Sequence, residues 1–212
     1  MNLVDGPTLE ILPGDHVALT ANPSFDAASF EIWNSLVHGA TIFVLTAHLA
    51  DTDAVVNFFR DKHIHKAFLP TAVFHRLFSD AAAAASLGAT LRMINIGGEK
   101  LTTTIAKSFL QHAPHTRLTN GYGSAETTIC ATLFEVTQEA LGFDDSIGRP
   151  IPIGRPIPNT LFFLLDDDLH QVNFGHPGEI CIAGAALARG YLDLSQVPSA
   201  KFSKFQRPLF ER

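Results

Sequence analysis

The chain has few of the residues that stabilise small secreted or metal-binding domains. Its 212 residues include only two cysteines, Cys130 and Cys181, which lie far apart and form no CxxC pair. This argues against a disulfide or zinc framework. The N-terminus has no charged start followed by an apolar core, and no uncharged apolar run approaches the ~18 residues of a membrane span. We therefore expect a cytoplasmic chain with no signal peptide and no membrane partner.

An excess of positive charge is also missing. Lys and Arg together number 15 and Asp and Glu 21, which gives a net charge of -6. Binding to nucleic-acid phosphates needs the opposite sign, so we expect no nucleic-acid partner. The chain is instead rich in hydrophobic residues, at 46%, and only 17% of it is charged. This composition excludes extensive disorder and can supply a sizeable core.

Apolar and amphipathic segments alternate along residues 1–137. Strands are predicted at 16–20, 41–45, 67–69, 91–96 and 117–119, and helices at 25–38, 51–62, 70–78 and 102–112. The alanine run at 81–85 fits either a helix continuation or an exposed loop. Strands and helices alternating at such short intervals predict an α/β fold, with a mostly parallel sheet and helices on both faces.

The composition changes after residue 137, where proline and glycine become frequent. Strands are predicted at 161–165 and 179–183, the second followed by a turn and a helix. We expect residues 1–137 to form an α/β portion and residues 138–212 to begin a small β-rich subdomain. The unit Ile-Gly-Arg-Pro-Ile-Pro occurs twice, at 147–152 and 153–158. Two copies are too few for a repeat architecture, so we interpret the second as a linker insertion.

Two glycine-containing loops follow predicted strands: Gly97-Gly98-Glu99 and residues 120–128. In parallel sheets, ligands bind at the carboxyl ends of the strands. Glycine lets the backbone approach a phosphate or base, and the ring of Tyr122 could stack on adenine. The carboxylate of Glu126 is a hard oxygen ligand suited to Mg²⁺. For both loops the alternative interpretation is a solvated structural turn.

Other motifs allow competing interpretations. Asp26 stands among apolar residues and would need a partner if buried, but it could simply cap the following helix. Gly121-Tyr122-Gly123 opens a dinucleotide fingerprint, yet Glu126 occupies its third glycine position, so an oxidoreductase is a poor match. His63 and His65 have no third metal ligand nearby in sequence, so no metal site is expected there.

Taken in order, five segments resemble the adenylation domains of nonribosomal peptide synthetases, within the larger family of adenylate-forming enzymes. They are residues 25–31, 95–99, 120–128, 153–160 and 178–192. The resemblance spans nearly the whole chain. It implies activation of an amino-acid carboxylate with ATP and Mg²⁺, followed by transfer of the acyl group to a carrier-protein thiol.

The resemblance also implies that residues 1–137 bind substrate and adenine, and it implies roles for particular residues. Asp26 would hold the α-ammonium group of the amino acid, and Glu126 would bind Mg²⁺. Ala125 stands where the family usually has a threonine that contacts the α-phosphate. The substrate-binding residues would be Asp26, Ala27, Phe30, Phe68, Ile94, Ile96, Gly121, Ile129 and Cys130. The nucleotide-binding residues would be Gly97, Gly98, Glu99, Asn120, Gly121, Tyr122, Gly123, Ser124 and Ala125.

Apart from Asp26, that substrate set is apolar or glycine, which predicts a small apolar amino acid resembling Val, Ile or Leu, with Phe as a further option. The implied partners are a peptidyl carrier protein and condensation domains of a larger synthetase. The family's phosphate loop is missing from residues 1–25, and its catalytic-lysine domain from the C-terminal end. We therefore expect a partial adenylate-forming fold that is inactive alone. The alternative is an inactive remnant or nucleotide-binding module of the same fold.

Overall fold

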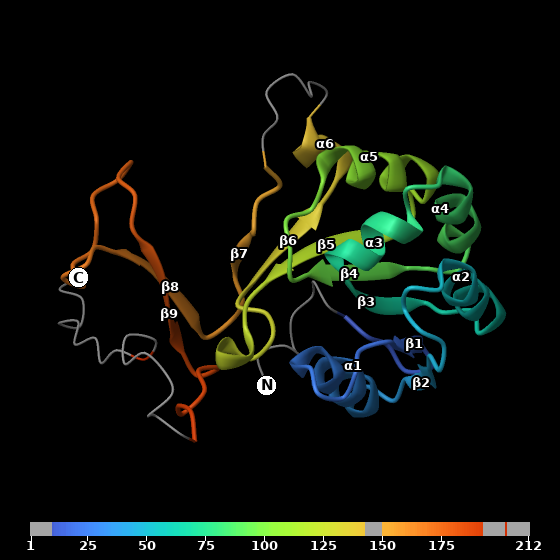
Figure 1. Ribbon diagram of the computed structural model, residues 1–212, viewed down its shortest axis with the longest axis horizontal. Helices are drawn as coiled ribbons and strands as arrows, with labels where there is room; N and C mark the ends of the chain where they lie inside the picture. Colours follow the sequence, from blue (N-terminus) through green and yellow to red (C-terminus); the bar gives the residue numbers. More distant parts are fainter. Residues whose placement is uncertain (1–9, 143–149, 193–201, 203–212) are drawn as a thin grey trace.

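The computed structural model describes residues 10–142, 150–192 and 202. They form a seven-stranded sheet flanked by helices and a separate two-stranded sheet (Figure 1). The strands are β1 (His16–Leu19), β2 (Thr41–Val44), β3 (Lys66–Pro70), β4 (Met93–Gly97), β5 (Arg117–Tyr122), β6 (Thr132–Val136), β7 (Arg155–Pro156), β8 (Thr160–Leu165) and β9 (Glu179–Gly184). The helices are α1 (Asp26–Val37), α2 (Thr52–Asp61), α3 (Thr71–Leu77), α4 (Ala81–Gly88), α5 (Thr103–His112) and α6 (Gln138–Leu141).

The strand order of the large sheet is β2-β1-β3-β4-β5-β6-β7. The first five of these strands are mutually parallel, and β6 and β7 extend the sheet in antiparallel fashion. The expected α/β class is therefore confirmed. Because β3, β4 and β5 lie side by side in the middle of the sheet, their carboxyl ends form one edge.

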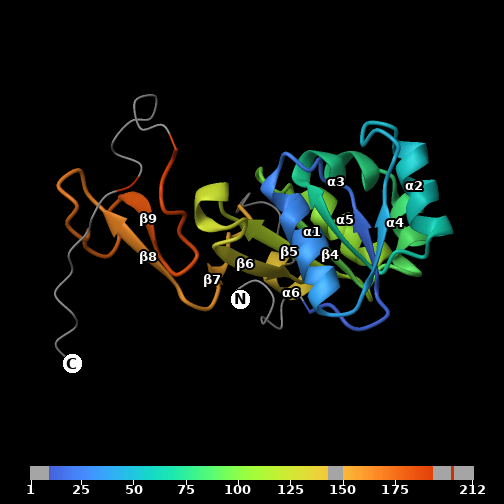
Figure 2. The same cartoon turned by 90° about the horizontal axis from the view of Figure 1, so that it is seen from below.

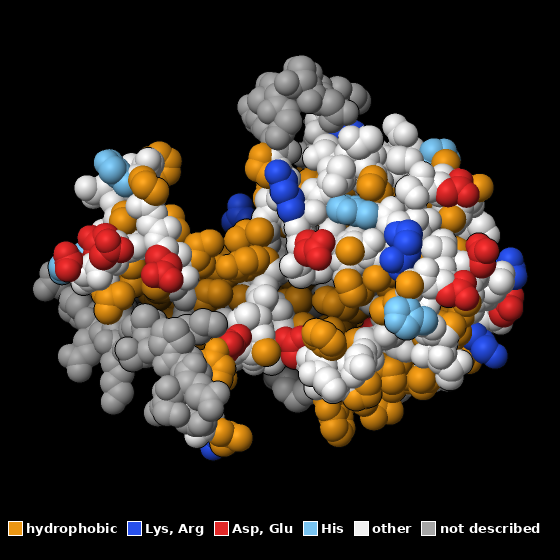
Figure 3. Space-filling view, in the orientation of Figure 1, with side chains coloured by type: hydrophobic (Ala, Val, Ile, Leu, Met, Phe, Trp, Pro, Cys, Tyr) orange, Lys and Arg blue, Asp and Glu red, His pale blue; other side chains and the backbone are white. Residues whose placement is uncertain are grey.

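Helices cover both faces of this sheet (Figure 2). On one face α2 to α5 bury the main core, in which Phe59, Phe74 and Phe109 are fully inaccessible to solvent. On the other face α1 packs against β1, β2 and β3. The outer side of α1 is apolar and exposed, as the gathered hydrophobic side chains in Figure 3 show. Trp33 and Val37 on this side each leave 59% of their surface accessible.

Two helix starts follow from local hydrogen bonding. The side chain of Asp51 accepts a hydrogen bond from Ala54 N at 3.0 Å, which begins α2. The side chain of Asp80 accepts one from Ala82 N at 2.9 Å, so the alanine run forms its own helix, α4, rather than an exposed loop. Among the described residues, no helix combines the length and apolar character needed to cross a membrane.

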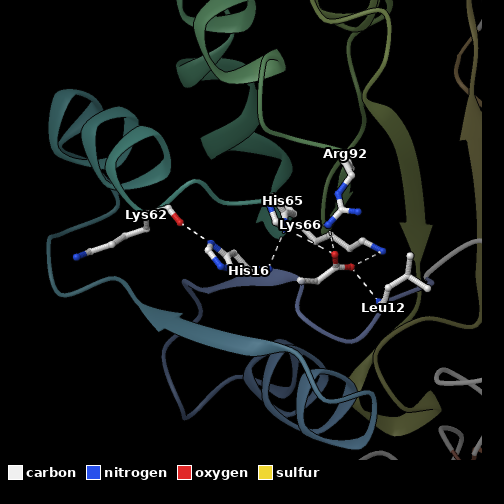
Figure 4. A network of polar contacts seen from close by, with 7 residues as sticks. Leu12, His16, Lys62, His65, Lys66 and Arg92 are labelled. Carbon is white, nitrogen blue, oxygen red and sulfur yellow. Dashed lines mark hydrogen bonds and ion pairs between the residues drawn. The ribbon is translucent and has the colours of Figure 1, made fainter.

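A cluster of charges joins three strands at the edge opposite the carboxyl ends (Figure 4). The carboxylate of Asp15, which is 1% exposed, pairs with Lys66 at 3.0 Å and with Arg92, and accepts a hydrogen bond from Leu12 N. Burial alone would raise the pKa of Asp15. The hydrogen bond from Leu12 and the two cations hold that pKa below its ordinary value instead.

The second sheet consists of the antiparallel hairpin β8–β9. Strand β7 still pairs with β6, and Ile151 packs in the main core, so the two sheets divide after Pro156 rather than at residue 137. Both copies of the six-residue repeat thus have packing roles, although residues 147–149 of the first copy lie outside the described residues. After β9, residues 185–192 form turns and irregular backbone, and the helix expected there is absent.

Candidate functional site

The two glycine loops lie next to each other because β4 and β5 are in register. Gly97 pairs directly with Gly121. A Cβ atom on Gly97 would come within 2.8 Å of the Gly121 carbonyl oxygen, closer than real contacts allow. Next in the chain, Gly98 has a φ of +94° and open space around it, a conformation that other residues adopt only at a cost. The close approach of these backbones explains why glycine stands at the last position of β4 and at the position before the last in β5.

Asp26 is the first residue of α1 and is half-buried. Phe25 occupies the N-cap position, and no side chain makes a capping hydrogen bond there, so the simple capping role considered for Asp26 is wrong. The carboxylate is close enough to Cys130 to help raise the pKa of that thiol, although burial is the larger cause. Asp26 thus faces the end of β5 and the turn that follows it.

One turn further along α1, Phe30 packs on the same face of the sheet. Its ring lies 6.1 Å from that of Phe68, and Ile129 joins this apolar cluster. Two residues that the sequence analysis did not assign, Met93 and Leu133, complete it. Three of the expected substrate residues are therefore brought together, and Phe68 and Ile129 remain partly accessible.

Ile94 and Ile96 do not belong to this group. Both are fully buried in the main core, under the helices of the opposite face. Successive side chains of a strand point to opposite faces, so Asn95 is the residue of β4 that shares the face of Phe68, its register partner on β3. Ile94 and Ile96 therefore lie on the face opposite Phe30 and Phe68, although the sequence analysis grouped all four residues in one pocket.

Asn95 is 1% exposed and lies between β5 and the turn that carries Cys130. Its Oδ1 accepts a hydrogen bond from Thr119 Oγ1 at 2.9 Å, and its side chain also interacts with the thiol of Cys130. A Cβ atom on Gly121 would lie 2.9 Å from Cys130 Sγ and 3.3 Å from Asn95 Oδ1. Burial raises the pKa of Cys130 to about 12, so the thiol is neutral. The side chains of Asn95 and Cys130 thus meet above Gly121.

The residues after β5 form a tight, ordered turn. Thr127 Oγ1 accepts a hydrogen bond from Ser124 N at 3.0 Å and donates one to Ser124 O at 3.1 Å. Ser124 and Ala125 are exposed, and Tyr122 is 37% accessible, so its ring is available for stacking. The amide of Asn120 donates a hydrogen bond to Pro152 O at 2.9 Å and anchors that segment. Its expected role in nucleotide binding stays a prediction.

Glu126 lies in the same turn and is half-buried. Its carboxylate accepts a hydrogen bond from the hydroxyl of Tyr191, which raises the pKa of Tyr191. Among the described residues, no three His, Cys, Asp or Glu side chains gather into a metal-binding group. Mg²⁺ is commonly held by one or two carboxylates together with substrate phosphates, so a single glutamate beside the two glycine loops fits the chemistry of that ion.

Comparison with known proteins identifies the family to which this chain belongs. Residues 2–192 match the model of a family described as AMP-binding enzyme. The chain therefore belongs to the AMP-binding enzymes. Within that family its sequence groups with the adenylation domains of nonribosomal peptide synthetases.

Two curated relatives and one solved structure illustrate the similarity. The chain is 34% identical over 189 residues to surfactin synthase subunit 2 of Bacillus subtilis, covering 89% of this chain and 5% of that protein. It is 34% identical over 195 residues to the nonribosomal peptide synthetase asaC of Aspergillus flavus. That match covers 92% of this chain and 18% of the relative. The solved structure is holo-PA1221, which is described as containing adenylation and PCP domains. It matches with a TM-score of 0.79 and 29% sequence identity, and the match covers 92% of this chain and 33% of that one. The chain thus spans only a small part of these relatives.

Proposed function

We propose that this chain forms the amino-acid and adenine-binding part of an adenylation domain, which joins an amino acid to AMP for transfer to a carrier protein. The observation that carries the proposal is the convergence of Asp26, the Gly97–Gly121 pair and Tyr122 at the carboxyl ends of β4 and β5. Such an edge is where sheets of this kind bind ligands. Family membership adds independent support.

In this proposal the half-buried carboxylate of Asp26 pairs with the α-ammonium group of the amino acid. Phe30, Phe68 and Ile129 contact its side chain. The substrate carboxylate oxygen then attacks the α-phosphorus of ATP, the bond to the β-phosphate oxygen breaks, and pyrophosphate leaves. Because the reacting groups are both anionic, most of the acceleration must come from positioning and charge stabilisation.

The nucleotide would bind beside the two glycine loops. The accessible ring of Tyr122 stacks on adenine, and the glycine backbones allow close approach. Glu126 would hold Mg²⁺, which supplies charge neutralisation at the phosphates when it is bound. The acyl-adenylate is then consumed by the thiol of a carrier protein, as in the synthetases to which the chain is similar.

The proposal is tested by calorimetric titration of the chain with AMP and with the sulfamoyl-adenosine analogue of glycyl-adenylate, which resists hydrolysis. Tyr122→Ala should weaken binding of both ligands by about 1–3 kcal/mol, the range typical of base–aromatic stacking. Asp26→Asn should weaken only the glycyl analogue, by about 2–5 kcal/mol, because only that ligand carries an ammonium group.

The matched control is Asp53→Asn, which changes an exposed acid in the first turn of another helix. It should leave both affinities unchanged. Equal loss of AMP and glycyl-analogue binding in Asp26→Asn would contradict the ammonium role, and unchanged AMP binding in Tyr122→Ala would contradict the adenine site.

A further inference from the structure

Glu31 is a buried carboxyl that the proposed mechanism does not use. It follows Phe30 in α1 and is 1% exposed, and burial raises its pKa to about 7. Keeping a carboxylate in such a place costs free energy unless several hydrogen bonds hold the charge. The donors that surround Glu31 therefore indicate what the charge does.

The carboxylate binds the segment that leads from β1 to α1. Oε2 accepts a hydrogen bond from Ala21 N at 3.0 Å, Oε1 accepts one from Thr20 Oγ1 at 3.0 Å, and both oxygens lie 3.2 Å from Thr20 N. Residues 22–25 form a tight turn between Ala21 and Asp26, in which Phe25 N donates to Asn22 O at 2.9 Å. Glu31 thus fixes one end of a short turn whose other end is Asp26.

The same hydrogen bonds reach a second element that carries candidate substrate residues. Thr20 Oγ1 lies 3.0 Å from Glu31 Oε1 and 3.0 Å from the carbonyl oxygen of Phe68. Glu31 belongs to α1, which also carries Asp26 and Phe30, whereas Phe68 belongs to β3. No side chain makes a capping hydrogen bond at the start of α1, so the bonds to Glu31 hold the approach to this helix in place.

We infer, on the basis of the proposed function, that Glu31 is a positioning residue, which holds the carboxylate of Asp26 where that carboxylate pairs with the ammonium group of the amino acid. Its own oxygens are occupied by Thr20 and Ala21, so Glu31 acts through Asp26 and not on the ligand itself. If the turn shifts, Asp26 shifts with it. An ion pair weakens as its charges separate and as water enters between them.

A pair of ligands of nearly the same shape isolates the contribution of the ammonium group. The sulfamoyl-adenosine analogue of glycyl-adenylate carries an ammonium group, and the corresponding glycolyl analogue carries a hydroxyl in its place. We would titrate the chain calorimetrically with both at about pH 7.5, where Glu31 is mostly ionised. The wild-type chain should prefer the glycyl analogue by about thirtyfold or more, because only this ligand pairs with Asp26.

Glu31→Gln keeps the size of the side chain but turns one acceptor oxygen into a donor. Thr20 or Ala21 then loses its acceptor in either orientation of the amide. This variant should lower the preference for the glycyl analogue about tenfold, whereas its affinity for AMP should stay within about threefold of the wild-type value. A purely structural role would not separate the two ligands in this way.

Thr20 supplies a milder pair of variants, which decides the question if Glu31→Gln does not fold. Thr20→Val removes the hydroxyl and should lower the preference about threefold, whereas Thr20→Ser keeps the hydroxyl and should retain the wild-type preference. The matched control is Thr116→Val. Thr116 is 2% exposed, precedes β5 at the amino ends of the strands, and donates to Leu91 O at 2.7 Å. This control should keep the wild-type preference.

A double variant tests whether Glu31 acts through Asp26. Asp26→Asn alone should remove the preference, and addition of Glu31→Gln should then change the affinity for the glycyl analogue by less than about twofold. A further tenfold loss in the double variant would overturn the inference.

Two other results would also overturn it. One is an undiminished preference in Glu31→Gln, or in Thr20→Val if the first variant does not fold. The other is an equal loss in Thr20→Val and Thr116→Val, which would assign the effect to general loosening of the fold. A wild-type chain that binds both analogues equally would instead contradict the proposed function, and this inference would fall with it.

Discussion

At the scale of single residues, Glu31 is a buried carboxyl whose pKa lies well above its ordinary value. Its side chain is 1% exposed and accepts hydrogen bonds from Thr20 N, Thr20 Oγ1 and Ala21 N, with the two bonds from Oγ1 and Ala21 N at 3.0 Å. Burial raises the pKa of Glu31 to about 7, although these hydrogen bonds lower it in part. The carboxyl therefore ties the end of β1 to α1 and takes up a proton near neutral pH.

The raised pKa predicts a pH dependence of stability. Between the ordinary value of 4.5 and about 7, the folded chain binds more protons than the unfolded chain at this site. The contribution of Glu31 to the free energy of unfolding is therefore fully present below pH 4.5 and is lost as pH rises towards 7. The loss is on the order of 3 kcal/mol. Urea unfolding across this range should show this slope, and Glu31→Gln should remove it. Equal slopes in both proteins would contradict the assignment.

At the scale of secondary-structure elements, the buried ion pairs of Asp15 hold together strands that are distant in sequence. Asp15 precedes β1, Lys66 begins β3 and Arg92 precedes β4. Lys66 is itself only 7% exposed. Removal of the acid would leave its ammonium group buried without a counter-charge, and such a change costs far more than the loss of a surface pair.

Asp15→Asn should accordingly lower the free energy of unfolding by about 3–5 kcal/mol, measured by denaturant titration. Asp61→Asn serves as the matched control, because Asp61 pairs with Arg60 on the surface, where it is 62% exposed. That variant should change stability by less than about 1 kcal/mol. Equal effects of the two substitutions would show that burial of the Asp15 pairs has no energetic consequence.

At the scale of the whole molecule, the segment after β9 is tied to the turn that carries Glu126. The hydroxyl of Tyr191 donates to the Glu126 carboxylate, and Ala188 N donates to Glu126 O at 2.8 Å. Thr128 Oγ1 donates to Ala186 O at 2.6 Å. These bonds connect the region of the small sheet to the large one across more than fifty residues of sequence.

Removal of one of these bonds should loosen the others. Tyr191→Phe should increase the hydrogen-exchange rate of the Ala188 amide several-fold, because the contact of that amide with Glu126 opens more often. Tyr122→Phe is the matched control, since it deletes a tyrosine hydroxyl elsewhere in the chain. Exchange measured by NMR that is unchanged in Tyr191→Phe, or changed equally in both variants, would contradict this link.

Much of the large sheet was predictable because its signals are local. Short apolar, β-branched segments predict strands, and the amphipathic segments between them predict helices. When strands and helices alternate with short connections, the strands pair in parallel. Strand β6 was not predicted from the sequence. The irregular segment after β9 was predicted as a helix, although Gly190 with a φ of +134° is incompatible with one there.

The sequence by itself determined which loops could bind a ligand, because glycines at the ends of β4 and β5 are visible as a motif. It could not determine which side chains of β4 pack in the main core and which share the face of Phe30 and Phe68. The period of a strand is two, so an error of one position exchanges the two faces, and a fully buried strand has no polar alternation to mark them. Only the packing of Ile94 and Ile96 beneath one layer of helices, with Asn95 left beside Cys130 on the other face, decided it.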